Sequence, residues 1–62
     1  MKHNGYEFAY CLSGSMQYWI ADREYVLEPG DSLVFQARLL HRWQNPTGET
    51  AEILLVLFDT TS

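Results

Sequence analysis

The sequence has few of the features that usually stabilise a very small protein. It contains one cysteine, Cys11, so no disulfide forms within the chain of 62 residues. A single domain of this length, 1–62, buries only about 60% of the surface that its unfolded chain exposes, and such cores usually need a disulfide, a metal ion or oligomerisation. With a disulfide excluded, the sequence favours the other two. One cysteine also fits a reducing compartment, and we expect a cytoplasmic location.

Basic residues and long apolar runs are also scarce. Four Lys and Arg residues stand against eight Asp and Glu residues, for a formal net charge of −4. Nucleic-acid binding would call for a basic patch, so we expect no direct contact with nucleic acid. The longest apolar run, residues 53–58, is far shorter than the roughly 20 residues of a membrane span. No apolar segment of a signal peptide follows the first five residues, and we expect no membrane association.

Strand patterns fill the chain, and no segment has the apolar spacing of a helix. Short segments that are rich in aromatic and β-branched residues, or alternate between apolar and polar residues, predict six strands at 7–12, 15–21, 25–28, 32–36, 42–44 and 51–59. Pro29 and Gly30 mark a tight turn, and residues 12–15 are predicted to close a hairpin between the first two strands. This regular spacing predicts an all-β barrel or sandwich.

The last predicted strand is apolar on both faces. One face carries Ile53, Leu55 and Leu57, and the other carries Leu54, Val56 and Phe58. Both faces therefore need to be covered, and the interior of one small domain accounts for only one of them. A second copy of the chain is the expected cover for the other face, so we predict a homodimer.

Three side chains are candidates for a metal site: His3, Glu7 and His41. The first two share a strand face, which is opposite to the face of the aromatic residues in the strand predicted at 7–12. His41 comes from the second half of the chain. Two imidazoles and one carboxylate suit a mononuclear divalent ion, namely zinc, iron, manganese or nickel. Spacing alone leaves another interpretation open, in which His41 lines a cavity and bonds to Asn45 or to a backbone carbonyl without any metal.

Three further residues are candidates for lining a ligand cavity: Cys11, Arg38 and Trp43. Cys11 shares the face of Glu7, Trp43 shares the face of His41, and Arg38 precedes His41 in a connection. The alternatives are structural, because Trp43 also fits a core, Cys11 a small buried apolar position and Arg38 a solvated loop.

The motifs His3-x3-Glu7-x6-Gly14 and Gly30-x10-His41-x3-Asn45 resemble the two motifs of the cupin superfamily, in the same order and separated by a short segment. The resemblance implies a cupin-type jelly-roll, an antiparallel β-barrel that is short and N-terminally minimal, since the chain begins at the first motif. It also implies His3, Glu7 and His41 as metal ligands, with Met1 at the position of a further histidine. The family pattern has proline and glycine where this chain has Gln36 and Arg38.

Segments 7–14, 27–32 and 41–46 are similar to one group in particular, the C-terminal sensor cupins of bacterial helix-turn-helix transcription regulators. That resemblance implies a small binding or sensor domain that holds a divalent metal ion, a small-molecule ligand or both, and that dimerises. We expect no helical DNA-binding domain in this chain. The alternative is a metal-dependent cupin enzyme of the dioxygenase, isomerase or decarboxylase type. The interior positions offer no clear second acid or base, which favours binding over catalysis.

Overall fold

The structure is a computed structural model that describes residues 5–59, and its regular elements are all strands. In chain order they are β1 (Gly5–Ser13), β2 (Met16–Ile20), β3 (Arg23–Leu27), β4 (Ser32–Gln36), β5 (His41–Gln44) and β6 (Glu52–Asp59). The all-β expectation is confirmed, and each predicted strand is present with its bounds shifted by a few residues at most. Within residues 5–59 there is no helix long and apolar enough to cross a membrane.

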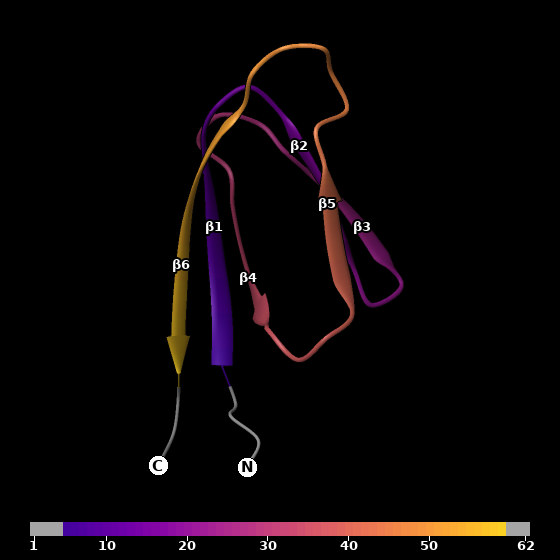
Figure 1. The fold of residues 1–62 in the computed structure, drawn as a ribbon, viewed down its shortest axis with the longest axis vertical. Coiled ribbons are helices and arrows are strands. Elements are labelled where there is room, and N and C mark those ends of the chain that lie inside the picture. The colour runs from indigo at the N-terminus through magenta and orange to yellow at the C-terminus, as the bar shows by residue number, and fades with distance from the viewer. Residues whose placement is uncertain (1–4, 60–62) are drawn as a thin grey trace.

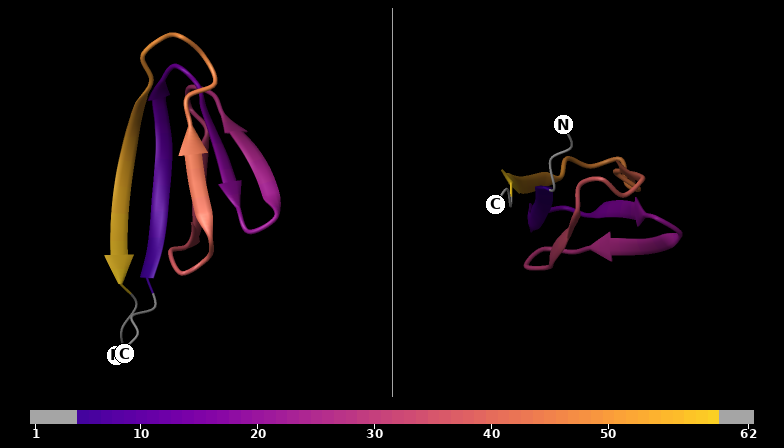
Figure 2. Two further views of the ribbon diagram at one scale, coloured as in Figure 1. Left: turned by 45° about the vertical axis from the view of Figure 1, so that its right-hand side comes forward. Right: turned by 90° about the horizontal axis from the view of Figure 1, so that it is seen from below.

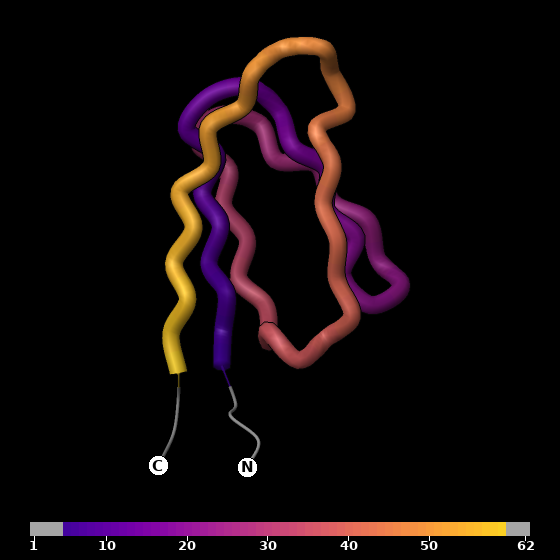
Figure 3. Tube along the Cα trace, viewed as in Figure 1, coloured from indigo at the N-terminus to yellow at the C-terminus, as the bar shows by residue number. Residues whose placement is uncertain are grey.

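The strands form two antiparallel three-stranded sheets that face each other (Figure 1). The first sheet has the order β4-β1-β6 and the second has the order β3-β2-β5. The chain crosses between the sheets four times, because only β2 and β3 are consecutive strands of one sheet (Figure 3). Among residues 5–59 no strand pairing joins the two sheets into a closed barrel. Figure 2 shows this arrangement from the side and from below.

The predicted hairpin between β1 and β2 is wrong. The two strands lie in different sheets, and the segment between them carries the chain from one sheet to the other. Gly14 has a φ of 77° in this segment, and a Cβ there would lie 2.7 Å from the Cα of Ala51. Glycine is therefore required by a left-handed backbone and by the close approach of the loop before β6. The same residue type that permits a hairpin turn also permits this crossing, so the local sequence did not separate the two.

The turn predicted at Pro29 and Gly30 is confirmed. The amide of Asp31 donates to the carbonyl of Glu28 at 2.8 Å, and Gly30 has a φ of 92°. Proline fixes φ at the first central position and glycine supplies the positive φ at the second. This turn brings β4 back to β1. The amide of Cys11 donates to the carbonyl of Asp31, and the amide of Gly30 donates to the carbonyl of Cys11.

The core lies between the two sheets. Alternation along β1 places Glu7, Ala9 and Cys11 on its inner face and the aromatic residues on its outer face, as the sequence pattern predicted. The buried apolar side chains are Ala9, Cys11, Tyr18, Ile20, Leu27 and Phe35. Glu7 is the one buried charged residue among those described.

Candidate functional site

Glu7 lies on the central strand of the first sheet and points toward the second sheet. Its residue is only 6% exposed, and its β1 position is paired with Phe35 on β4 and Leu57 on β6. A carboxylate in such a position is costly unless it is hydrogen-bonded, paired or coordinated. Among residues 5–59 its one polar contact is with His41, which makes that contact the natural starting point for the site.

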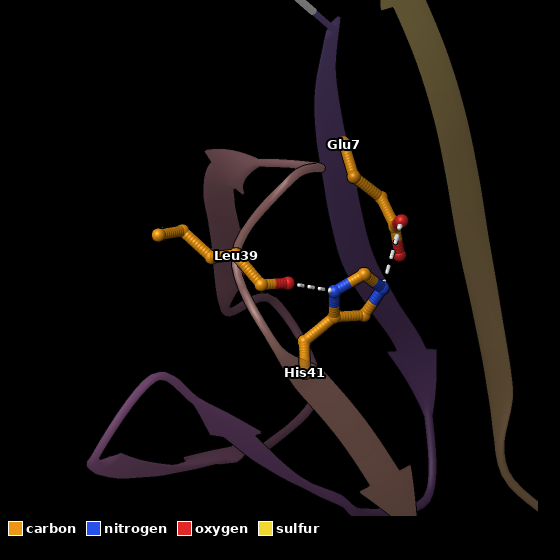
Figure 4. Close-up of polar contacts among 3 residues, drawn as sticks. All are labelled: Glu7, Leu39 and His41. Carbon is orange, nitrogen blue, oxygen red and sulfur yellow. Dashed lines mark hydrogen bonds and ion pairs between the residues drawn. The ribbon is translucent and has the colours of Figure 1, made fainter.

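His41 is the first residue of β5, in the opposite sheet. Its Nδ1 lies 2.6 Å from the carbonyl oxygen of Leu39 (Figure 4). A carbonyl only accepts, so Nδ1 carries the hydrogen, and in the neutral ring Nε2 has a free lone pair. Nε2 lies 3.7 Å from Oε1 of Glu7, which is longer than a hydrogen bond. The backbone of Leu39 therefore orients His41 so that its lone pair points at the buried carboxylate.

A cavity of about 240 Å³ lies between β6 of the first sheet and β2 and β5 of the second. Its lining residues are Glu7, Met16, Tyr18, Trp43, Ala51, Ile53 and Leu55. The ring centroids of Tyr18 and Trp43 are 6.2 Å apart, and the ring of Trp43 is stacked on that of His41 at the same distance. The cavity therefore combines one carboxylate with an aromatic and aliphatic wall, a lining suited to a small ligand with an apolar body.

Tyr18 belongs to this site although the sequence analysis did not assign it there. Burial raises the pKa of its hydroxyl, and the charge of Glu7 and then that of Cys11 raise it further. The hydroxyl is therefore neutral at physiological pH and remains available as a hydrogen-bond donor. Its place next to Trp43 follows from the register between β2 and β5, which no local pattern specifies.

The structure places the other candidates differently. His3 and Met1 lie outside the described residues. Trp43 lines the cavity. Cys11 is fully buried, and its Sγ lies 3.5 Å from the carbonyl oxygens of Ser13 and Gly14. Arg38 is exposed in the connection before β5, where its Nε donates to Gln36.

Neither Cys11 nor Arg38 is among the residues that line the cavity beside Glu7. Burial raises the pKa of the Cys11 thiol, and the charges of Glu28 and Asp31 raise it further. The thiol is thus in its neutral form and is directed at backbone, as for a small buried apolar residue.

A divalent metal ion fits the donor pair that Glu7 and His41 form. A histidine that ligates a metal through one ring nitrogen usually donates its other N–H to a carbonyl or carboxylate, as His41 does toward Leu39. Two ligand atoms of one such ion, each about 2.1 Å from it, lie roughly 3.0–3.5 Å apart, close to the observed 3.7 Å. Within residues 5–59 no third His, Cys, Asp or Glu joins them. His3, the third ligand that the resemblance implies, lies outside that range.

A second and larger cavity opens on the other side of the core, between β3 and β4. Its volume is about 400 Å³, and its charged lining residues are Asp22, in the turn between β2 and β3, and Arg23, the first residue of β3. No carboxylate is buried there. Glu7 lines the smaller cavity, and His41, which is not among the lining residues, faces Glu7 with its Nε2 3.7 Å from Oε1. We therefore place the candidate site in the smaller cavity, beside Glu7.

These features define a small all-β domain with an acidic and aromatic site between two antiparallel sheets. A family model described as "Cupin domain" matches residues 1–57. The chain belongs to this cupin family. No curated protein and no solved structure matches the chain significantly.

Proposed function

We propose that this cupin domain is a binding module that holds a divalent metal ion, a small molecule or both beside Glu7 and His41. One observation carries the proposal. Glu7 is a buried carboxylate, and its only polar contact among the described residues is an imidazole nitrogen 3.7 Å away. A bound cation or a ligand donor between the two atoms would compensate the buried charge.

Glu7, His41 and His3 are the residues that would hold the metal. Glu7 and His41 come from facing sheets, so binding there would also tie the two sheets together. When bound, a zinc, iron, manganese or nickel ion supplies a Lewis-acid position at which a ligand oxygen or nitrogen can coordinate. Tyr18 and Trp43 would contact the apolar part of that ligand, and the hydroxyl of Tyr18 would donate to a polar group on it.

Binding is favoured over catalysis by the inventory of ionisable groups. Glu7 and His41 are the proposed metal ligands, and Tyr18 is the one further ionisable side chain among those lining the cavity; its pKa is raised. A general base works best when its pKa lies near the working pH, so Tyr18 is a poor one. The metal-dependent enzyme remains the alternative from the sequence, and no feature of the described site favours it.

The closed barrel and the regulatory context are parts of the same proposal. We propose that the two sheets are the facing halves of a cupin-type jelly-roll, a view supported by the family match over residues 1–57 and by the antiparallel pairing. The similarity to the sensor cupins of helix-turn-helix regulators supports a ligand-sensing role in the cytoplasm. In that role the cupin domain would bind the small molecule and another domain would bind DNA.

Metal titration of the tag-free protein tests the proposal. We expect binding of at least one of Zn²⁺, Ni²⁺, Mn²⁺ and Fe²⁺ by calorimetry. Glu7→Gln and His41→Gln should each weaken it by about 10- to 100-fold, which is the scale of perturbed metal sites. Glu49→Gln, which removes an exposed carboxylate elsewhere, is the matched control and should have no effect. Affinity that is unchanged in both site variants would overturn the metal site.

Binding of a small molecule can be measured separately, by tryptophan fluorescence. The chain has two tryptophans, Trp19 and Trp43, and only Trp43 lines the cavity. In a Trp19→Phe background the fluorescence therefore reports on the cavity, and a ligand that enters it should shift the emission of Trp43. A screen of small aromatic and polar compounds, with and without the metal, measures this shift. Compounds that shift the wild-type emission but not that of the Trp19→Phe protein bind elsewhere.

A further inference from the structure

A groove of about 240 Å³ lies on the outer side of the second sheet, where the end of β2 runs beside the start of β5. Its lining residues are Trp19, Ala21, Leu40, His41 and Arg42. Trp19 pairs with Arg42 in the register of β2 and β5, and the residues on either side of Trp19 are buried, so both side chains point away from the core. Glu7 is not among the lining residues, and this outer groove is separate from the site between the sheets.

One backbone hydrogen bond holds the end of the outer groove together. The amide of Ala21 donates to the carbonyl of Leu40 at 2.8 Å, which joins the β2–β3 turn to the residue before β5. The side chain of Leu40 is 85% exposed, the highest value among the large apolar side chains described. A single exposed leucine is common on protein surfaces. Leu40, however, is held beside an indole and a guanidinium, so the three groups form one mixed surface.

The guanidinium of Arg42 lies 3.9 Å from the ring of Trp19. A stacked guanidinium uses its flat face for the ring and keeps the N–H groups along its edge for other partners. Among residues 5–59 no carboxylate lies within ion-pairing distance of Arg42. Glu24 is the carboxylate of the same cross-strand row, but it lies on the other side of Trp19, on β3, and accepts a hydrogen bond from Gln17. Arg42 therefore presents an uncompensated charge and a set of oriented donors.

We propose that the outer groove binds a small organic carboxylate. The two carboxylate oxygens would accept from the edge of the Arg42 guanidinium, which matches their geometry. The apolar body of the ligand would lie against the indole of Trp19 and the side chain of Leu40. The groove of about 240 Å³ is smaller than the usual sites for drug-sized molecules. The ligand is therefore a molecule with a single ring or a short carbon chain.

The charge of the outer groove favours one negative charge on the ligand. Among the described residues that line it, Arg42 is the only Lys, Arg, Asp or Glu. One guanidinium matches one carboxylate, whereas a phosphate group carries nearly two negative charges at neutral pH. The chain as a whole has a formal net charge of −4, which adds to the cost of a more highly charged ligand. The groove thus selects an anion, unlike the cavity beside the buried Glu7 carboxylate.

Fluorescence of Trp19 in a Trp43→Phe protein tests the proposal, because Trp19 is then the only tryptophan. The probe is phenylacetate, titrated in the presence of a chelator so that no metal ion between the sheets binds it. We expect a saturable change in emission with a Kd on the order of 1 mM, as for a very small ligand with one partly exposed ion pair. Phenylacetamide, which lacks the charge, and acetate, which lacks the apolar body, should each bind at least about fivefold more weakly.

Two substitutions in this background separate the polar and apolar contacts. Arg42→Gln should weaken phenylacetate binding by about tenfold, because it removes a charge-assisted pair. Arg38→Gln is its control, since Arg38 is exposed in the connection before β5, carries the same charge and does not line the groove. Leu40→Ser should weaken binding by about threefold through lost apolar contact. Its control is Leu12→Ser, which removes a leucine that is 55% exposed at the far end of β1. Both controls should bind like the parent protein.

Nitrogen-15 NMR of the wild-type protein gives a second measurement that does not depend on emission. The Trp19 indole N–H and the amides of Ala21, Leu40 and Arg42 should shift with the same Kd, and circular dichroism checks that each variant is folded. Absence of saturable binding by both methods up to about 20 mM phenylacetate would overturn the proposal. So would equal binding of phenylacetamide, or full affinity in Arg42→Gln. None of these results bears on the site beside Glu7, which the metal titration tests separately.

Discussion

Glu7 and His41 face each other across the gap between the two sheets, with Oε1 of one 3.7 Å from Nε2 of the other. Glu7 is fixed by the alternation of β1, which has a sheet neighbour on each side. His41 is fixed by a backbone carbonyl two residues before it, at the entry to β5. The two side chains are therefore held independently, one by a strand and one by a turn. A ligand that bridges them would find both already oriented.

The first prediction concerns the cost of the buried Glu7 carboxylate. Glu7→Gln keeps the shape and removes the charge, so the metal-free protein should become more stable by about 1–2 kcal/mol. The same variant should bind metal more weakly, because an amide is a poorer ligand than a carboxylate. Urea denaturation with a chelator present measures the first effect. A Glu7→Gln protein less stable than the wild type would mean that the charge is already well compensated within the fold.

The second prediction concerns the tautomer of His41. In the neutral ring, Nδ1 should carry the hydrogen and Nε2 should show the chemical shift of an unprotonated nitrogen. Long-range proton–nitrogen correlation spectra distinguish the two forms. Addition of Zn²⁺ should then change the Nε2 resonance and leave the Nδ1–H in place. A hydrogen found on Nε2 would contradict the bond from His41 to Leu39 that orients the ring.

The third prediction compares three glycines. Gly14→Ala should destabilise the fold by about 2–4 kcal/mol, from a strained positive φ together with a steric clash. Its Cβ would meet backbone atoms of Thr50 and Ala51 at 2.7 Å. Gly30→Ala has the positive φ and open space around it, so about 1 kcal/mol is expected. Gly48→Ala has neither problem and serves as the control, within about 0.5 kcal/mol of the wild type. Thermal and urea denaturation measure all three, and equal effects at Gly14 and Gly30 would contradict the close contact.

The fourth prediction concerns pH and Cys11. Its pKa in the folded protein is raised from an ordinary value of 9.0, first by burial and then by Glu28 and Asp31. Between the unfolded and folded pKa values the unfolded chain releases a proton that the folded chain keeps. The contribution of the thiol to stability is therefore complete below about pH 9 and declines as the pH rises through the folded pKa.

The measurement compares the wild type with Cys11→Ala. The variant loses packing at all pH values but lacks the titrating group. The stability difference between the two proteins should therefore shrink from about pH 7.5 to about pH 10. A difference that stays constant over this range would show that Cys11 does not titrate with a raised pKa.

Elements that depend on neighbouring residues in the chain were predictable. Alternation along β1 assigned Glu7 to the face opposite the aromatic residues, and the Pro29-Gly30 pair fixed the turn before β4. Both follow from local geometry, since a strand has a side-chain period of two and a turn of this type requires a positive φ at one position. The family motifs likewise rest on local spacing, and the match over residues 1–57 confirms the family.

The pairing of strands was not predictable in the same way. The sequence indicated a hairpin between β1 and β2, but β1 pairs with β4 and β6 instead. Gly14 serves either arrangement, and the choice depends on which apolar faces each arrangement covers. Tyr18 is a second example, because its place beside Trp43 and Glu7 is set by the β2–β5 register and by the packing of the sheets.

The sequence by itself thus determined the all-β class, the strands, the two faces of β1, and the identity of Glu7 and His41 as site candidates. Only the tertiary structure decided that these two side chains meet and that Leu39 orients the imidazole. The reason is physical. Strand periodicity and turn geometry are properties of a few adjacent residues, whereas contacts between sheets depend on the burial of the whole chain.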